Sequence, residues 1–177
     1  MNKLQKEFSD IYDQNINRIY RFIFVKVNSK EVAEDLCSET FLRTWQAFQK
    51  AGNPGHSQKI KNPSAFLYQI ARNLVVDHYR EKGRTQFISI ENLPIVDPRM
   101  TIGEKVALNS DLEQVKIALA NLNEDYQNVI IWHYLDDLPI PEIAQILDKQ
   151  EGAVRVQLHR ALKCLKEECN KININTS

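Results

Sequence analysis

The stretch that decides the fold runs from Pro139 to Lys166 and reads PIPEIAQILDKQEGAVRVQLHRALKCLK. Pro141 suits the first turn of a short helix, and apolar residues then recur at helical spacing up to Asp148. After a short connection and Gly152, a second apolar stripe follows, formed by Val154, Leu158, Ala161, Leu162 and Leu165. The spacing predicts two helices joined by a tight turn, each with one face in a core.

The second of these helices is cationic on the face away from its apolar stripe. At about 100° per residue, the residues opposite the stripe are Val156, His159, Arg160 and Lys163, with Arg155 on the flank. Two short helices of which the second has a basic outer face are typical of a helix-turn-helix, whose second helix enters the DNA major groove. The alternative is a helical hairpin with a solvated charged face.

Length and composition indicate an ordinary soluble protein. The 177 residues suffice for one large domain or two small ones, and 43% of them are hydrophobic. No apolar run approaches the ~20 residues of a membrane span, and the first ten residues lack the apolar core of a signal peptide. We therefore expect a cytoplasmic protein with no membrane insertion.

The residues that usually carry chemistry are scattered. Cys37, Cys164 and Cys169 lack the C-x-x-C spacing of zinc or redox sites, and the four histidines form no ligand motif. No nucleophile and base pair with a recognisable pattern is present either. The sequence predicts no catalytic site, no metal and no cofactor, and we expect the protein not to be an enzyme.

The zero formal net charge hides an uneven distribution along the chain. Residues 61–90 carry five bases against two acids, residues 91–150 carry four bases against eleven acids, and residues 151–177 carry five bases against three acids. Two basic segments, of charge +3 and +2, are therefore separated by an acidic one of charge −7. Such a distribution is compatible with nucleic-acid binding despite the neutral total.

The N-terminal half is predicted to be helical throughout. Apolar residues at helical intervals over 4–27 indicate one or two helices, and Asn28 and Ser29 offer an N-cap for another over 30–48. On that second helix Leu42 lies on the polar face, beside Asp35 and Glu39. A leucine ringed by acids either has no role or anchors a partner helix.

A third helix is predicted over 65–82, entered through Pro63 and ended by Gly83. Its predicted buried stripe is Leu67, Ile70, Ala71, Leu74 and His78, and the residues opposite are Gln69, Arg72, Val76, Tyr79 and Arg80, with Asn73 beside them. Arginines among an aromatic ring and amides suit single-stranded nucleic acid, since bases stack on flat side chains while cations follow the phosphates. A solvated helix face is the alternative.

The remaining segments divide the chain. Residues 84–110 have no sustained period and are predicted to be a flexible linker, whereas 111–122 are amphipathic and Asn123 can cap the helix that follows. We therefore predict an all-α fold of two small helical domains, 1–83 and 111–170, the second ending in the helix-turn-helix. Residues 171–177 are predicted to be a disordered tail.

Taken together, three stretches resemble the RNA polymerase sigma factors of the sigma-70 family, in their minimal extracytoplasmic-function (ECF, group 4) form. EVAEDLCSETFLRTW (31–45) resembles the second-region helix, and PSAFLYQIARNLVVDHYREKGR (63–84) resembles the promoter-opening helix. The segment 122–167, which contains the helix-turn-helix, resembles the fourth region. The three stretches stand in the family's order and cover nearly the whole chain.

The resemblance implies a function and its residues. It implies binding to core RNA polymerase through Asp35, Glu39 and Leu42. It implies reading of the promoter −35 element by a set that comprises Arg155, Val156, His159, Arg160 and Lys163 (the −35 set). It implies opening of the −10 element by a second set that comprises Lys59, Lys61, Asn62, Ser64, Arg72, Asn73, Tyr79 and Arg80 (the −10 set). An anti-sigma factor is the further implied partner.

The recognition helix departs from the family where Ala153, Val156 and Gln157 replace the usual hydroxyls and one cation. Val156 can contact a thymine methyl group instead, which leaves the −35 sequence open.

Two other classes remain as alternatives. A helical adaptor or anti-activator would use Leu42 and the acidic segment to bind a protein, with the helix-turn-helix as scaffold. A one-component repressor would account only for the C-terminal half.

Overall fold

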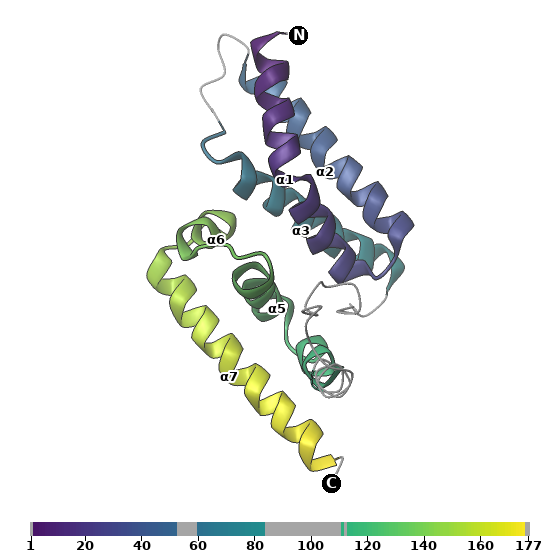
Figure 1. Ribbon diagram of the computed structural model, residues 1–177, viewed down its shortest axis with the longest axis vertical. Coiled ribbons are helices and arrows are strands. Elements are labelled where there is room, and N and C mark those ends of the chain that lie inside the picture. Colours follow the sequence, from purple (N-terminus) through teal and green to yellow (C-terminus); the bar gives the residue numbers. More distant parts are fainter. Residues whose placement is uncertain (1, 53–59, 84–110, 112, 176–177) are drawn as a thin grey trace, which may run out of the picture.

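The computed structural model describes residues 2–52, 60–83, 111 and 113–175, with side chains to residue 173. Every regular element in these ranges is helical, which confirms the all-α prediction (Figure 1). The named elements are α1 (Lys3–Val27), α2 (Lys30–Ala51), α3 (Pro63–Lys82), α5 (Glu124–Ile130), the π-helix η1 (Ile131–Leu135), α6 (Ile140–Leu147) and α7 (Glu151–Asn175). Residues 113–120 are helical as well. Of the described helices, none has the length and apolarity needed to span a membrane.

Local sequence signals account for where the helices begin and end. The Ser29 hydroxyl accepts a hydrogen bond from the N–H of Val32, and the Asn123 side chain accepts one from the N–H of Tyr126, as predicted for both N-caps. The end of α3 at Gly83 is also as predicted, because this residue takes the left-handed conformation with φ +58°.

The first three helices form a bundle with an aromatic-rich core. α1 is one continuous helix, and α2 and α3 pack against it (Figure 1). The fully or nearly buried apolar residues of this bundle include Ile19, Phe22, Ile23, Phe41, Leu67 and Ala71. Pairs of rings, such as Phe8 and Trp45 with centroids 5.0 Å apart, extend the core toward the N-terminus. The bundle orients the outer faces of α2 and α3.

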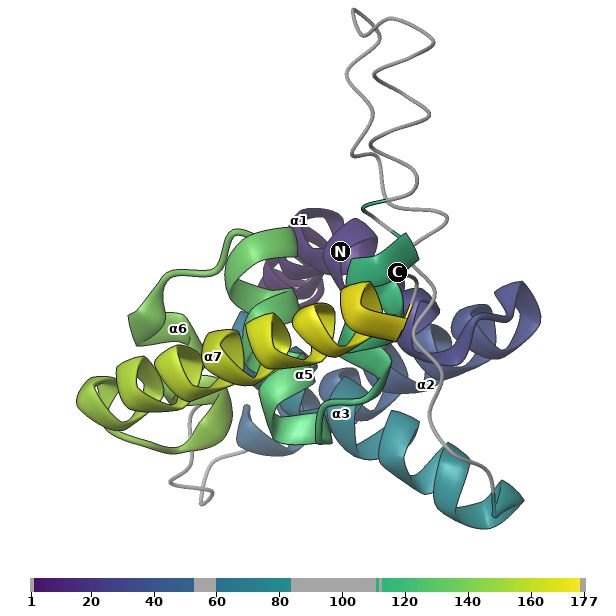
Figure 2. The same ribbon diagram turned by 90° about the horizontal axis from the view of Figure 1, so that it is seen from below.

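The C-terminal unit packs against this bundle and completes one common core. Trp132 of η1 is fully buried, with its ring centroid 5.7 Å from that of Phe22 and 6.1 Å from that of Tyr68. Figures 1 and 2 show α5 and α6 beside α1 and α3. Two helical units were predicted, but periodicity does not predict that they share a core. The predicted linker, 84–110, lies outside the described residues.

Two details of the C-terminal unit differ from the prediction. The helix capped by Asn123 turns into a π-helix over Ile131–Leu135 before the predicted break. α7 continues to Asn175, so residues 171–175 are helical rather than a disordered tail. Two interactions of Glu168 stabilise this extension: a hydrogen bond from the Asn121 side chain and an ion pair of 2.6 Å with Lys171. The first joins residues that are 47 positions apart in the sequence, so no local pattern predicts it.

A buried cation lies between the two units. Lys26, at the end of α1, is 1% exposed, and its ammonium donates to the side-chain oxygens of Gln127 at 3.0 Å and Asn128 at 2.9 Å on α5. Burial lowers the pKa of Lys26 from 10.5 to about 8, while the carboxylates of Glu124 and Asp125 act in the opposite direction. The fold therefore buries this amine at a cost that depends on pH.

We expect the contribution of Lys26 to stability to change above pH 8. Between pH 8 and 10.5 the folded chain releases the Lys26 proton while the unfolded chain keeps it, so the unfolded state binds more protons. The free energy of unfolding of the wild type should then rise relative to that of Lys26→Met, by roughly 2 kcal/mol at about pH 10. Urea titrations from pH 7 to 10 measure this difference.

The matched control is Lys30→Met, which removes a lysine whose side chain is 77% exposed. Its stability difference from the wild type should stay flat over the same range. If the difference in free energy of unfolding between the wild type and Lys26→Met also stays constant from pH 7 to 10, the lowered pKa of Lys26 is contradicted.

Candidate nucleic-acid and partner interfaces

The predicted helix-turn-helix is present in α6 and α7. Asp148 ends α6 in the left-handed conformation, with φ +51°, and α7 begins at Glu151. Val154 and Ala161 are fully buried and Leu158 nearly so, which fixes the orientation of α7. Two helices joined by a short turn, residues 148–150, form a helix-turn-helix, with α7 in the position of the recognition helix.

All five residues of the −35 set are exposed on α7, as the periodicity predicts: Arg155, Val156, His159, Arg160 and Lys163. Val156 is 50% exposed. The Arg155 guanidinium donates to Glu151 at 3.1 Å. Gln157 is half-buried, and its side chain accepts a hydrogen bond from Lys149 and donates one to the carbonyl of Asp125. The exposed face is thus cationic with one apolar contact point.

The residues of the −10 set on α3 do not all lie on the same side of the helix. Asn73 and Arg80 are exposed and Arg72 is half-buried, so these three share one side of α3, where they line a hollow of about 480 Å³. The opposite wall of that hollow is formed by Glu124 and Asp125 of α5. The α3 face therefore meets acids of the C-terminal unit.

Tyr79 does not belong to this face, and its prediction as a stacking residue is wrong. It is 8% exposed, and its hydroxyl donates to the carbonyl of Lys26 at 2.6 Å. His78 and Ile70, predicted to be buried, are only partly so, whereas Tyr68 and Val75 are fully buried. The reason is that α3 packs against α1, α2 and α6 and so has more than one buried stripe, and Tyr79 lies on the side that meets α1.

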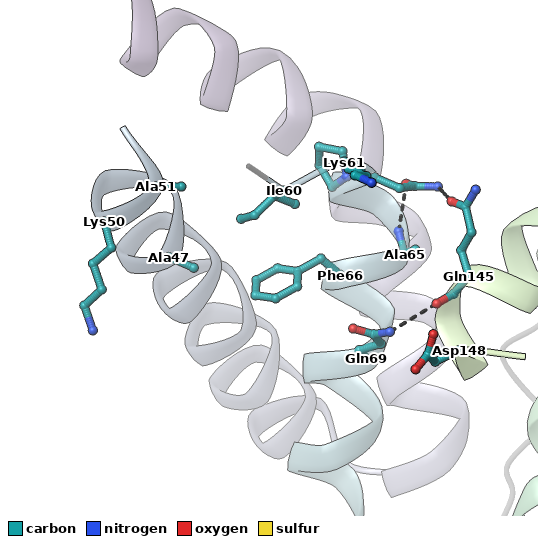
Figure 3. A pocket seen from close by; sticks show the side chains of 12 residues that line it. Ala47, Lys50, Ala51, Ile60, Lys61, Ala65, Phe66, Gln69, Gln145 and Asp148 are labelled. Carbon is teal, nitrogen blue, oxygen red and sulfur yellow. Dashed lines mark hydrogen bonds between the residues drawn. The ribbon is translucent and has the colours of Figure 1, made fainter. Parts of the chain in front are cut away.

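The start of α3 carries the rest of the −10 set. Lys61 is exposed, Ser64 is half-buried, and Lys59 lies outside the described residues. Asn62 is the N-cap of α3, since its side-chain oxygen accepts from the N–H of Ala65 at 3.0 Å. Beside them a hollow of about 920 Å³ opens between the end of α2 and the start of α3 (Figure 3).

Periodicity places Gln69 on the exposed face of α3, but the structure gives it a partner on α6. Its amide donates to the carbonyl oxygens of Gln145 at 3.1 Å and Ile146 at 3.0 Å. The Gln145 side chain also accepts a hydrogen bond from Asn62. Figure 3 shows Gln145 and Asp148, at the end of α6, beside Gln69. No local signal predicts this contact, since the partners are 76 or more residues apart.

The surface around Leu42 is exposed and larger than predicted. Leu42 is 50% exposed on α2, with Asp35 exposed and Glu39 paired to Arg43 at 2.6 Å. Beside Leu42 is a hollow of about 450 Å³ lined by aromatic residues of both α1 and α2: Phe8, Tyr12, Phe41 and Trp45. Tyr12 is 41% exposed. The sequence pattern did not predict these aromatic residues as part of the surface, because they come together only when α1 packs against α2.

One buried carboxylate connects the two units. Asp136 follows η1 and accepts hydrogen bonds from Arg21 of α1 at 2.6 and 2.9 Å and from the Tyr68 hydroxyl of α3 at 3.0 Å. Burial raises the pKa of Asp136, and the bonds from Arg21 and Tyr68 oppose that rise. Burial also raises the pKa of Tyr68, so its hydroxyl keeps the proton that it donates.

Among the described residues, no group of histidine, cysteine, aspartate or glutamate side chains could hold a metal ion. Cys37 is buried, Cys164 and Cys169 are half-buried, and all three are free thiols. The hollows are open and lie between helices.

Comparison with known proteins agrees with this geometry. The family model for sigma-70 region 2 matches residues 11–85, and the model for sigma-70 region 4 matches residues 112–165. The ECF RNA polymerase sigma factor BldN of Streptomyces coelicolor is 31% identical over 159 residues, which are 89% of this chain and 58% of that protein. SigW of Bacillus subtilis, also an ECF sigma factor, is 27% identical over 173 residues, covering 93% of this chain and 89% of that protein.

A solved structure supports the fold. The sigma factor RpoE of Bartonella quintana, in complex with the anti-sigma factor NepR, aligns with a TM-score of 0.61 at 23% identity, covering 93% of this chain and 98% of that one. The chain belongs to the sigma-70 family of RNA polymerase sigma factors, as an ECF member. It is therefore a regulatory factor of promoter recognition and transcription initiation. The match to region 2 spans most of α1 and all of α2 and α3, and the match to region 4 spans α5, α6 and the first part of α7.

Proposed function

We propose that this chain binds core RNA polymerase through the Leu42 surface of α2 and reads the −35 element with the exposed face of α7. The outer side of α3 then holds the separated −10 strand. The observation that carries the proposal is the match to both region models, in order, on helices whose exposed faces carry the corresponding residues. The corrected −10 set is Lys59, Lys61, Asn62, Ser64, Arg72, Asn73 and Arg80.

The sigma-factor function accounts for more of the chain than the alternatives do. A helical adaptor would leave the cationic face of α7 without a purpose, and a one-component repressor would not use Asn73 or Leu42. The protein acts by binding in the cytoplasm and catalyses no reaction of its own. Its relatives include sigma factors found with anti-sigma factors, so an anti-sigma partner is part of the proposal.

Leu42→Arg should weaken binding to core polymerase tenfold or more while leaving helicity intact. The exposed leucine would be the buried anchor of the complex, and an arginine there would have to be desolvated beside the apolar hollow. Titration of labelled protein with core enzyme measures the loss. Gln46→Arg, an exposed position one turn further along α2, is the matched control. Equal affinities for Leu42→Arg and wild type would exclude this surface.

Arg155→Ala and Arg160→Ala should separate base reading from phosphate binding. A bidentate arginine to guanine contributes about 1–3 kcal/mol of discrimination, so loss of the base reader relaxes preference at one −35 position. Loss of a phosphate contact weakens all sequences alike and reduces the salt dependence. Holoenzyme footprints on a panel of mutated −35 elements distinguish the two, with exposed Lys166→Ala as control. If neither alanine has an effect, α7 does not read the element.

Asn73→Ala should reduce open-complex formation while −35 binding and core binding stay near normal. Extruding a base costs a few kcal/mol, and the cationic and amide contacts of the corrected −10 set with the separated strand must recover it. A template already mismatched at −10 should rescue much of the loss. Permanganate reactivity of unpaired thymines is the readout, with exposed Asn17→Ala on α1 as control. Full reactivity of the variant on a paired promoter would refute the role.

A further inference from the structure

The turn of the helix-turn-helix carries a cation that the helical period of α7 does not include. Lys149 is exposed on this turn, and its backbone N–H donates to the carbonyl of Ala144 at 2.9 Å. Its ammonium donates to the side-chain oxygen of Gln157, on α7, at 3.0 Å. The Gln157 amide in turn donates to the carbonyl of Asp125, on α5, at 3.3 Å. The turn, α7 and α5 therefore fix the direction of the Lys149 side chain together.

Lys149 lies beside the flank of α7 on which Gln157 stands. At about 100° per residue, Arg155 and Gln157 are roughly 200° apart around α7, on opposite flanks of the face that contains Val156. Arg155 places a guanidinium on its flank, whereas Gln157 places only a neutral amide on the other. Lys149 brings an ammonium to within 3.0 Å of that amide. Both flanks of the recognition helix are thereby cationic.

A hollow connects Lys149 to the face that carries the −35 set. Lys149 and Gln157 line a hollow of about 450 Å³ between the start of α5 and the start of α7. Two residues of the −35 set, Val156 and Arg160, line the same hollow. Asp125 is the acid among the lining residues, so two cations stand against one carboxylate. A ligand on the −35 face therefore comes next to Lys149.

The charge of Lys149 is available to such a ligand. Among the described residues, Lys149 and Arg160 form no ion pair, whereas Arg155 is paired with Glu151 at 3.1 Å. An ammonium has three donors, and Gln157 takes one of them. Because this partner is a neutral amide, it orients the ammonium without neutralising it. The remaining donors suit an anion that approaches from solvent.

The anion expected at the flank of a recognition helix is a phosphate of the duplex. An α-helix with its side chains is about 10–12 Å across, and the major groove is about 12 Å wide. A helix that fills the groove therefore brings its two flanks to the phosphates of the two strands. Contacts with phosphates set the register of the helix, while contacts with base edges give the sequence preference. A lysine binds a phosphate as a point charge.

We infer that Lys149 binds a backbone phosphate of the −35 duplex and that Gln157 is a positioning residue that holds the Lys149 ammonium toward it. The inference rests on the proposed function, because it requires α7 to lie in the major groove of the −35 element. It adds to the −35 set a residue of the turn. It also gives Gln157 a role that acts through Lys149.

Lys149→Gln should weaken holoenzyme binding to all −35 sequences alike. Loss of one phosphate contact should lower affinity roughly three- to tenfold and reduce the slope of log affinity against log salt by about 0.9. Titrations of preformed holoenzyme on the panel of mutated −35 elements, from about 50 to about 200 mM salt, measure both quantities. Lys30→Gln removes an exposed lysine from α2 and is the matched control, for which both quantities should stay unchanged.

A charge swap separates the cation from the residue that carries it. The double variant Lys149→Gln with Gln157→Lys moves the ammonium from the turn to the same flank of α7. It should restore the affinity and the salt slope to within about twofold of the wild type. A role of Lys149 in the shape of the turn alone predicts no recovery, because glutamine remains at position 149. Urea titration of each variant verifies that the fold is kept.

Gln157→Ala tests the positioning role. Lys149 keeps its charge in this variant but loses its orientation, so affinity should fall roughly two- to threefold with the salt slope unchanged. In the Lys149→Gln background the same substitution should have no further effect, since no ammonium is left to orient. Equal losses in both backgrounds would show that Gln157 does not act through Lys149 and would overturn the positioning role.

The outcomes distinguish this inference from the proposed function. If Arg160→Ala weakens binding but Lys149→Gln changes neither affinity nor salt slope, α7 still reads the −35 element and the phosphate contact of Lys149 is refuted. The contact is also refuted if Lys149→Gln alters preference at one −35 position, or if the folded swap variant shows no recovery. Wild-type holoenzyme that binds every −35 sequence of the panel equally would overturn the proposed −35 role of α7 and this inference with it.

Discussion

The arrangement of this sigma factor depends on a carboxylate that its own fold removes from water. Asp136 is 2% exposed, and such burial is costly unless every lone pair finds a donor. Arg21 and Tyr68 supply those donors from helices more than 60 residues away in the sequence. The contact therefore forms only when α1, α3 and η1 meet in one geometry. It favours this one arrangement of the helices over others more than it adds to the free energy of unfolding.

The contacts between the two regions are mixed in character. Trp132 contributes a large buried apolar surface, whereas Lys26, Gln127 and Asn128 form a buried polar cluster beside it. The polar groups lose little on separation, because water can replace their partners, while a purely apolar interface would be harder to open. The indole N–H of Trp132 is buried without a hydrogen-bond partner among the described residues.

Much of the candidate site was predictable because it depends on one helix at a time. The five exposed residues of α7 and the exposure of Leu42 follow from the helical period, and Ser29, Asn123 and Gly83 act as the caps and stop that their side chains favour. Tyr79 was misplaced for the same reason. A helical period assumes one buried face, but α3 packs against α1, α2 and α6, and the side that meets α1 carries the tyrosine inward.

The sequence by itself determined the helical class, the helix boundaries to within a few residues and the cationic outer face of α7, because each rests on interactions between residues three or four positions apart. Only the tertiary structure decided that Tyr12 and Trp45 join Leu42, that Gln69 is engaged by α6, and that Glu124 and Asp125 face Arg72. These contacts pair residues from separate helices. Their geometry follows from the packing of Trp132 and the burial of Asp136, which no local spacing encodes.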